Sequence, residues 1–454
     1  MNDVNKNIFR EYDIRGIADS DFTDDLVINL GKAFGTYILR DGCKCISVSG
    51  DVRLTTPRLK KKLIEGVLST GINVIDIGIL PTPVNYFSMF CLDIDGAIQI
   101  TGSHNPKEYN GFKFSYKKTS FFGVQIQDLY RLIDSNDFDE GNGELICKNI
   151  MTSYIDMLNS KIKINKPINI VMDCGNAAGC ITGPDIHRQV GINVSEIFCD
   201  VDGNFPNHHP DPTEDKNLEI LIKEVNSKSV DFGVAFDGDA DRIVVVDENG
   251  KIIRSDMLIC LFINHLISKG EHVVYDVKCS KALEEVTNKR GGIPVMWKTG
   301  HSLIKQKMKE LDVKLAGEMS GHIFFADDYY GYDDAVYVSL RLAELLSNSS
   351  KTLSELVSDI PQYYSTPEIR IECESDEEKF EICRNVEKFC LEKYDCINID
   401  GGRIQYENGW GLVRASNTQP VIVCRFEANS NKELDLIKNN VLTIMKKFGN
   451  IHYE

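Results

Sequence analysis

The sequence predicts an α/β protein of several domains that ends in a smaller α+β segment. Helix-length and strand-length patterns alternate along most of the chain, and the apolar strands run into loops that contain Gly and Asp. The order in which helix-like and strand-like segments follow one another changes after the loop 362–367. At roughly 100–200 residues per domain, the 454 residues suggest about three to four domains.

The first elements follow from hydrophobic periodicity. Residues 57–70 have the pattern of an amphipathic helix that Gly71 closes, and residues 73–80 have the pattern of a strand. Further apolar strands, each followed by small or polar residues, are expected at 96–100, 167–173 and 230–236 and within 273–280 and 313–322. The helix-length segments between them imply crossover connections.

The C-terminal segment has a different order of elements. It predicts a strand, a helix, a strand-rich region and a second helix at 368–373, 376–394, 397–426 and 431–447. Boundaries are expected where polar turns interrupt the pattern, at 148–151, 248–250 and 362–367. The predicted domains, three of α/β type and a last one of α+β type, are therefore 1–150, 151–250, 251–364 and 365–454.

Charge and composition exclude several classes of function. With 51 Lys+Arg and 68 Asp+Glu, the formal net charge of −17 disfavours a general nucleic-acid or anionic-membrane binder, because both partners repel it. An anionic substrate must therefore be held by local cations and backbone N–H groups. The polar N-terminus 1–13 is not expected to be a secretory signal, and the apolar stretch 258–267 is too short to span a bilayer. The 14 cysteines form no C-x-x-C pair, so we expect reduced thiols and a cytoplasmic enzyme.

The sharpest local feature is the loop 237–242, Asp-Gly-Asp-Ala-Asp-Arg, which follows an apolar run. Its carboxylates at alternate positions, Asp237, Asp239 and Asp241, converge, which is unfavourable unless a hard divalent cation lies between them. An EF-hand is excluded because Arg242 stands where that loop needs Gly and because the flanks are strands. The loop thus predicts a Mg²⁺ site with positions open for water or a phosphoryl oxygen, and a solvated acidic turn is the alternative.

A second feature is the loop 101–106, Thr-Gly-Ser-His-Asn-Pro. Ser103 is presented by a tight loop at the end of the strand expected at 96–100, so it is a candidate nucleophile. The G-x-S-x-G motif of esterases is absent. Lys113 offers a cation and a proton donor if the chain folds back, and the alternative is a structural turn.

Two further loops offer groups for a sugar phosphate. The loop 414–420 combines a guanidinium, two hydroxyls and an amide, which suit a phosphate, in Arg414, Ser416, Asn417 and Thr418. The loop 318–322 combines groups that suit a polyol, in Glu318, Ser320 and His322. An ordinary loop and a capped turn are the respective alternatives.

Isolated polar residues are harder to interpret. Gly300 with His301, and Lys278 close to Asp276, are either surface residues or parts of a site. Arg10 and Arg15 are either solvated charges or anion ligands. His208 and His209 are adjacent, so their side chains diverge, and a metal pair is not expected.

Together and in this order, the motifs resemble the α-D-phosphohexomutase superfamily, from segment 9–16 (Phe-Arg-Glu-Tyr-Asp-Ile-Arg-Gly) to the loop 414–420. The resemblance covers nearly the whole chain. It implies four domains around a central cleft, three of them related α/β domains with mixed sheets and the last an α+β domain.

The resemblance also implies roles for the candidate residues. Ser103 would carry the phosphoryl group beside Lys113 and Arg15, and Ser103 would ligate Mg²⁺ together with Asp237, Asp239 and Asp241, with Arg242 nearby. The sugar would contact Glu318, Ser320 and His322. The distal phosphate would contact Arg414, Ser416, Asn417 and Thr418. Lys278, Gly300 and His301 match positions near the site: His301 would be a further catalytic residue, and Lys278 and Gly300 would bind the substrate. The general base is left open between His301 and Lys278.

The implied activity is a phosphohexomutase that interconverts hexose 1-phosphate and hexose 6-phosphate through a phosphoserine and a hexose 1,6-bisphosphate. The substrates are phosphosugars, mannose or glucose, and no nucleic-acid or membrane partner is expected. The loop 318–322 together with the loop 237–242 is similar to those of the bacterial phosphomannomutase/phosphoglucomutase branch, and Met319 is the discriminating position. The alternatives are a phosphoglucosamine mutase, which usually differs at that position, and a non-catalytic sugar-phosphate-binding protein, which predicts loss of Ser103 or of an Asp. The oligomeric state and the preferred sugar stay open.

Overall fold

The computed structural model describes residues 5–417, 421–449 and 451. The chain forms two compact units. The first comprises Met1–Ser255 with Ser320–Leu356, and the second comprises Asp256–Met319 with Val357–Glu454. The boundary between Met319 and Ser320 therefore falls inside the loop 318–322, which we expect to recognise the sugar.

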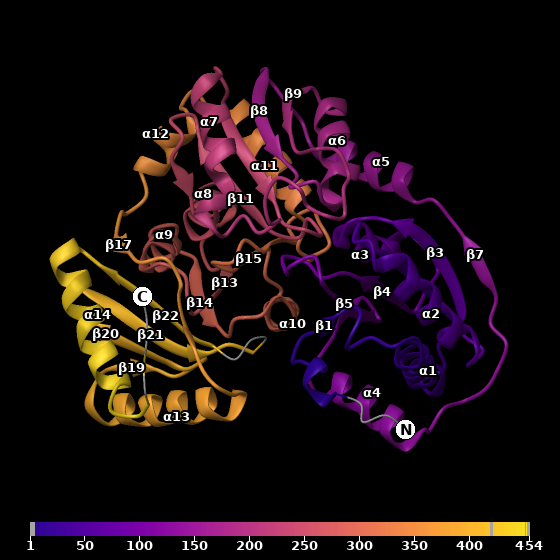
Figure 1. Ribbon diagram of the computed structural model, residues 1–454. Coiled ribbons are helices and arrows are strands. Elements are labelled where there is room, and N and C mark those ends of the chain that lie inside the picture. The colour runs from indigo at the N-terminus through magenta and orange to yellow at the C-terminus, as the bar shows by residue number, and fades with distance from the viewer. Residues whose placement is uncertain (1–4, 418–420, 450, 452–454) are drawn as a thin grey trace. The chain divides into compact units, whose positions relative to one another are not determined.

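The first unit begins with a mixed sheet of seven strands, in the order β1-β5-β4-β2-β3-β7 with β6 paired to β5 (Figure 1). β2, β3, β4 and β7 are joined by parallel pairings, whereas β5 pairs antiparallel with β1, β4 and β6. The strands are β1 (Ile14–Ile17), β2 (Cys45–Gly50), β3 (Asn73–Ile79), β4 (Gly96–Ile100), β5 (Tyr109–Tyr116), β6 (Thr119–Phe121) and β7 (Leu145–Cys147). The helical segments are η1 (Lys6–Ile8), α1 (Asp24–Arg40), α2 (Thr56–Leu68), α3 (Thr82–Cys91) and α4 (Val124–Ser135).

The two faces of this sheet differ because side chains alternate along a strand. Ile46 and Val48 of β2 lie in an apolar core with residues of α1, α2 and α4. The alternate residue Ser47 contacts Ser88 of α3 through a hydroxyl pair 2.6 Å apart. The helix α3 therefore covers the face opposite to the core of α1, α2 and α4.

The first unit continues with a five-stranded mixed sheet in the order β12-β11-β10-β8-β9. β8 pairs parallel with β9 and β10, and β11 pairs antiparallel with β10 and β12. The strands are β8 (Ile168–Asp173), β9 (Ile192–Ile197), β10 (Phe232–Phe236), β11 (Ile243–Asp247) and β12 (Ile252–Ile253). The other elements of this region are α5 (Met151–Lys161), η2 (Ala178–Ile181), α6 (Gly183–Gln189), η3 (Asp215–Leu218), α7 (Glu219–Ser227), β16 (Ile323–Phe325) and α11 (Ala335–Ser347).

The second unit contains the three parallel strands β14-β13-β15 and an antiparallel C-terminal sheet in the order β17-β22-β21-β20-β19, with β18 also paired to β22. The strands are β13 (His272–Asp276), β14 (Ile293–Trp297), β15 (Leu315–Gly317), β17 (Tyr364–Ser365), β18 (Ile369–Glu372), β19 (Cys396–Ile397), β20 (Gly402–Tyr406), β21 (Gly409–Ala415) and β22 (Val421–Ala428). The helices are α9 (Lys281–Lys289), α10 (His301–Leu311), α13 (Asp376–Lys393) and α14 (Asn431–Met445). Two further helices, α8 (Ser255–Leu266) and α12 (Leu353–Ser358), each begin in the last residues of a chain segment of the first unit and continue into the second unit.

The predicted α/β class with an α+β C-terminal segment is confirmed. The helix expected at 57–70 is α2 (Thr56–Leu68), and the strand expected at 230–236 is β10 (Phe232–Phe236). The apolar stretch 258–267 lies largely within α8, and no helix among the described residues is long and apolar enough to cross a membrane. The loops that carry Ser103 and the three carboxylates follow β4 and β10, so each begins where a buried strand ends.

Candidate active site

Ser103 occupies a buried and strained position in the loop after β4. Its φ of 47° lies in the left-handed region, which costs a residue with a side chain about 1–2 kcal/mol, and it is 1% exposed. Its backbone N–H donates to Oγ1 of Thr101 at 2.8 Å. Its Oγ donates to Oδ2 of Asp237 at 2.8 Å. The serine hydroxyl is thus held against the first carboxylate of the acidic loop.

The acidic loop 237–242 brings three buried carboxylates together. Ligand oxygens of Asp237, Asp239 and Asp241 lie within 4.8 Å of one another, and all three residues are 0% exposed. Oδ1 of Asp237 accepts the backbone N–H groups of Asp241 and Arg242, each at 3.1 Å. Gly238 permits the acidic loop to pack against the loop 101–106, called the serine loop below, because a Cβ at Gly238 would lie 2.2 Å from the carbonyl oxygen of Ser103.

Lys113 supplies a cation to this loop from β5. Its Nζ donates to Oδ2 of Asp239 at 2.7 Å and to Oδ2 of Asp241 at 2.6 Å. Burial by itself would lower the pKa of Lys113, but the two carboxylates raise this pKa above its ordinary value. Lys113 in turn offsets the effect of burial on Asp239 and lowers the pKa of that carboxyl.

The remaining negative charge fits a metal ion. Burial, Asp239 and Asp241 raise the pKa of Asp237 well above its usual range, so one lysine leaves the three carboxylates undercompensated. Among the described residues, Oδ1 of Asp239 and Oδ1 of Asp241 are buried without a hydrogen-bond partner. Carboxylate oxygens are the ligands that hard divalent cations prefer. The residues present can therefore bind a metal ion.

Arg15 joins the serine loop from β1. Its Nη1 donates to Oδ1 of Asn105 at 3.1 Å, and its Nη2 forms an ion pair with Asp13. β1 pairs with β5 so that Arg15 lies opposite Gly111. The pairing of these two strands therefore places the guanidinium of Arg15 against the same loop that presents Ser103.

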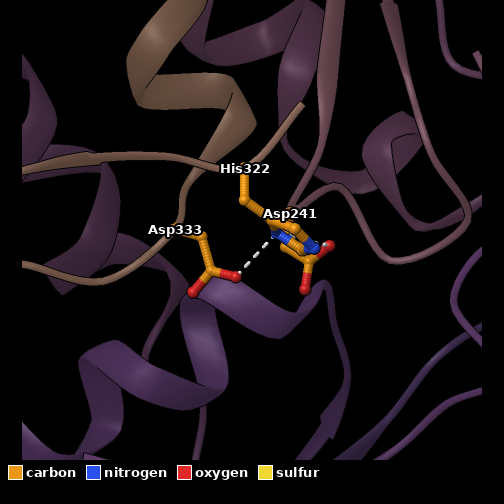
Figure 2. A group of neighbouring side chains, drawn as sticks. All are labelled: Asp241, His322 and Asp333. Atoms are coloured by element: carbon orange, nitrogen blue, oxygen red, sulfur yellow. Dashed lines mark ion pairs between the residues drawn. The ribbon is translucent and has the colours of Figure 1, made fainter. Parts of the chain in front are cut away.

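His322 lies between a guanidinium and two carboxylates. Its Nδ1 is 2.9 Å from Oδ2 of Asp333 and 3.6 Å from Oδ1 of Asp241, and Figure 2 shows the carboxylate of Asp333 facing the imidazole ring. Nε of Arg242 donates to Nε2 at 3.0 Å. Because Nε2 accepts this hydrogen bond, a neutral ring bears its proton on Nδ1, and that nitrogen then faces Asp333 as a donor and offers no lone pair to a metal ion. The cluster of Asp241, His322 and Asp333 has the spacing of a metal site but fits a histidine held between charges.

In the second unit, Arg414 is held by Asp400. Nε of Arg414 donates to Oδ2 of Asp400 at 2.9 Å, and the same oxygen accepts the N–H of Thr299 at 3.0 Å. The N–H of Gly300 donates to Oε1 of Glu318 at 2.5 Å. The loop before α10 therefore contacts Glu318 of the expected sugar loop, and it shares the carboxylate of Asp400 with Arg414 of the expected phosphate loop.

Lys278 belongs to a second charged group in this unit. Its Nζ donates to Oε2 of Glu368 at 3.1 Å and lies 3.8 Å from Oδ2 of Asp276. Burial opposes protonation of Lys278, but Glu368 and Asp276 raise its pKa. Burial likewise acts against ionisation of Glu368, and Lys278 and Arg370 lower the pKa of Glu368 to about 2. Both partners of this pair are therefore charged near neutral pH.

The residues singled out in the sequence lie in both units. The first unit brings together most of the catalytic and metal candidates, namely Arg15, Ser103, Lys113, Asp237, Asp239, Asp241, Arg242 and His322. It also contains the half-buried Ser320. The second unit contains Lys278, Gly300, His301, Glu318, Arg414, Ser416 and Asn417. The N–H of Ser416 donates to the carbonyl oxygen of Val421 at 3.0 Å, and Thr418 lies outside the described residues.

Several residues that contact the candidate site residues are not identified by the sequence patterns. Asp333 contacts His322, and Asp400 contacts Arg414. Both carboxylates belong to loops whose positions depend on distant chain segments. Thr82 donates from α3 to Oδ2 of Asp239. Asp51 and Arg53 were also missed, although they directly follow the buried strand β2, which is the signal that identified Ser103.

Comparison with protein families assigns four successive stretches of the chain to one family. The models of phosphoglucomutase/phosphomannomutase α/β/α domains I, II and III and of its C-terminal domain match residues 6–140, 152–250, 254–364 and 368–444.

Individual relatives match the chain over nearly its whole length. A phosphomannomutase/phosphoglucomutase of Pseudomonas aeruginosa is 42% identical over 435 residues, which cover 95% of this chain and 94% of that protein. A phosphoglucomutase of Neisseria gonorrhoeae is 37% identical over 455 residues, which cover 98% of each. The crystal structure of a phosphoglucomutase/phosphomannomutase family protein from Burkholderia thailandensis superimposes with a TM-score of 0.93 at 37% identity and covers 99% of each chain.

Proposed function

The chain belongs to the phosphoglucomutase/phosphomannomutase family and is a mutase that transfers phosphate within a sugar; we propose that Ser103 carries the phosphoryl group between the two positions of a hexose. The observation that supports this most strongly is the hydrogen bond from the buried Ser103 hydroxyl to Asp237. A lysine and an arginine lie against the same loops. This arrangement suits a serine that receives and returns a phosphoryl group.

The reaction consists of two transfers. In the first, a hydroxyl of hexose 1-phosphate or hexose 6-phosphate attacks the phosphorus and loses its proton, the bond between phosphorus and Oγ of Ser103 breaks, Oγ takes up a proton, and a hexose 1,6-bisphosphate forms. The bisphosphate then turns end over end and returns its other phosphate to Ser103. Lys113 and Arg15 offset the charge that spreads over the phosphoryl oxygens. Mg²⁺ bound by Asp237, Asp239, Asp241 and the phosphoserine would add further positive charge there.

The phosphate that does not react must be held while the other one moves. We assign this role to Arg414, Ser416, Asn417 and Thr418, and we assign sugar recognition to Glu318, Ser320 and His322. The ion pair of Arg414 with Asp400 supports this assignment, because it fixes the guanidinium through Nε on one side. Lys278 and Gly300 are assigned to substrate binding and the neighbouring His301 to catalysis, which agrees with the contacts of Gly300 with Glu318 and of Thr299 with Asp400.

Replacing Arg414 with alanine should raise KM for hexose 1-phosphate by roughly 30-fold to a thousandfold. A charge-assisted contact to a desolvated phosphate is worth on the order of 2–4 kcal/mol. The bisphosphate depends on the same loop while it turns, so the variant should also release more free bisphosphate. Initial rates and chromatography of the released bisphosphate measure both effects.

The exposed Arg384 of α13 provides the matched control, because Arg384→Ala removes the same side chain from the same C-terminal region. The control should leave KM within about twofold of the wild type. An unchanged KM and unchanged bisphosphate release in Arg414→Ala would mean that the distal phosphate is held elsewhere.

Glucose and mannose phosphates should both turn over. A carboxylate such as Glu318 can accept hydrogen bonds from the vicinal hydroxyls O3 and O4, which the two sugars share. A coupled assay of glucose 1-phosphate and mannose 1-phosphate, with and without a trace of the bisphosphate, tests this expectation and the proposed function together. A preference above roughly a thousandfold, about 4 kcal/mol, would mean that a group reads the C2 hydroxyl directly.

The same assay separates the proposed function from its alternatives. Turnover of glucosamine phosphate with neither glucose nor mannose phosphate as a substrate would identify a phosphoglucosamine mutase. The absence of turnover with all three sugars, in a folded protein supplied with Mg²⁺ and bisphosphate, would support a non-catalytic binding protein.

A further inference from the structure

Arg53, in the turn between β2 and α2, binds the serine loop (residues 101–106) and the segment that follows it through its guanidinium. The residue is 1% exposed. Its Nη2 donates to the carbonyl oxygens of Ser103 at 2.7 Å and Asn105 at 2.6 Å. Its Nη1 donates to the carbonyl oxygens of Pro106 at 2.6 Å and Tyr109 at 3.0 Å. One planar, charged group therefore fixes main-chain carbonyl groups along the loop that presents the nucleophile.

Asp51 fixes the other side of the same loop. Its Oδ2 accepts from Nε of Arg53 at 3.1 Å, from Oγ1 of Thr101 at 2.8 Å and from the N–H of Gly102 at 3.2 Å. Oγ1 of Thr101 in turn accepts the N–H of Ser103. The two peptide groups of Ser103 are thus both held, one through Thr101 and Asp51 and the other directly by Arg53.

The region that carries the acidic loop covers Arg53 from outside. The ring centroid of Phe205 lies 5.2 Å from Cζ of Arg53. A Cβ on Gly203 would lie 2.3 Å from the carbonyl oxygen of Val52, so this segment packs closely against the turn that carries Arg53. The cover excludes water from the guanidinium, which strengthens its hydrogen bonds to the loop.

From these contacts we propose that Arg53 is the positioning residue that holds Ser103 in line for phosphoryl transfer. The inference rests on the proposed function of Ser103. Ser103 has the left-handed φ of 47°, a conformation that the chain would leave if its carbonyl group were released. Relaxation of Ser103 would move its Oγ away from Asp237. Arg53 does not contact the sugar in this account; it acts through the serine loop.

A conservative substitution tests the role of the guanidinium. A lysine at this position keeps the charge, but its single ammonium group cannot reach the carbonyl oxygens that the two ends of the guanidinium bind. The matched control is Arg58→Lys in α2, because Arg58 also donates to main-chain carbonyl oxygens, those of Phe22 at 3.0 Å and Ala18 at 2.8 Å, but outside the serine loop.

The measurement is the phosphorylation of dephosphorylated full-length enzyme by glucose 1,6-bisphosphate in a single turnover, followed by quenching and mass spectrometry. The rate constant reports the positioning of Ser103, and the amplitude reports the fraction of folded enzyme. We expect Arg53→Lys to lower the rate constant by about a hundredfold, the usual effect of a misplacement of roughly 1 Å. The amplitude and the half-saturating bisphosphate concentration should change by less than about threefold, and Arg58→Lys should match the wild type within about twofold.

Three results would overturn the inference. The first is a rate constant for Arg53→Lys within about twofold of the wild type, and the second is a loss of amplitude at an unchanged rate constant, which is the signature of a purely structural role. The third is a wild type that bisphosphate does not phosphorylate on Ser103, which would overturn the proposed function as well.

Should Arg53→Lys fail to fold, Thr101→Val removes the hydroxyl between Asp51 and Ser103. It must lower the same rate constant by at least about tenfold for the inference to stand.

Discussion

Replacing Ser103 with alanine should lower the turnover of hexose phosphates by at least about a thousandfold. The substitution removes the oxygen that we propose carries the phosphoryl group between the two transfers, so neither transfer can proceed. The backbone should be little affected, because the hydrogen bonds of the Ser103 N–H and carbonyl groups do not involve Oγ. A coupled assay with saturating bisphosphate and Mg²⁺ measures the effect.

Ser115→Ala is the matched control for this experiment. Ser115 is 2% exposed and lies on β5, the strand that also carries Lys113, so the substitution removes a buried hydroxyl from the same sheet. Its turnover should stay within a few-fold of the wild type. Retention of more than a few per cent of turnover by Ser103→Ala, in a preparation free of contaminating mutase, would contradict the assignment of Ser103.

Replacing Asp239 with asparagine should lower turnover by on the order of a hundredfold to a thousandfold, and activity should require a higher Mg²⁺ concentration. The change removes one of three converging negative charges at almost constant volume and leaves Lys113 with one carboxylate partner fewer. Oδ1 of Asp239 is one of the buried oxygens without a hydrogen-bond partner among the described residues. Titration of activity with Mg²⁺ measures the change.

Asp247→Asn controls for the loss of a buried carboxylate. Asp247 is 2% exposed at the end of β11, and its Oδ1 accepts backbone N–H groups of Asn249 and Lys251, each at 2.9 Å, outside the acidic loop. The control should keep the wild-type Mg²⁺ dependence even if its stability falls. Activity of wild type and Asp239→Asn that is indifferent to EDTA would mean that the three carboxylates bind no metal ion.

The buried strands that end in site loops are the part of the fold that the sequence predicts best. The runs expected at 96–100 and 230–236 are β4 (Gly96–Ile100) and β10 (Phe232–Phe236). Both are short and largely apolar and run into loops that contain Gly102 or Asp237, so composition and length are sufficient to identify them. The convergence of Asp237, Asp239 and Asp241 could also be predicted, since the three residues lie within one loop.

The contacts between distant segments could not be predicted in the same way. Ser103 meets Asp237 across 134 positions of the sequence, and Arg53 meets the carbonyl oxygen of Ser103 across 50. No spacing rule relates residues so far apart, because their approach depends on strand order and on the packing of one sheet region against another. Arg53 is harder still to recognise, because its partners on the loop are main-chain oxygens that carry no sequence signal.

The role of His322 shows a further limit of the sequence. Its place in the loop 318–322 indicates a polar group for a sugar, but the ring is held by Arg242 on one nitrogen and faces Asp333 at the other. Asp333 follows an aromatic segment and has no motif of its own, so its contact with the ring appears only in three dimensions. The sequence therefore predicts which loops carry the chemistry better than it predicts which neighbours orient each side chain.

The central claim is that the phosphoryl group passes through Ser103, and transfer of a labelled phosphate tests it most directly. Dephosphorylated enzyme is incubated with glucose 1,6-bisphosphate that carries ³²P on both phosphates, separated from free sugar, digested and mapped; a second portion is chased with unlabelled glucose 1-phosphate. We expect the label in the peptide that contains Ser103, and we expect the chase to move it into glucose bisphosphate and then glucose 6-phosphate at a rate at least equal to turnover. Label on a different residue, or a label on Ser103 that the chase leaves in place while turnover proceeds, would contradict the account.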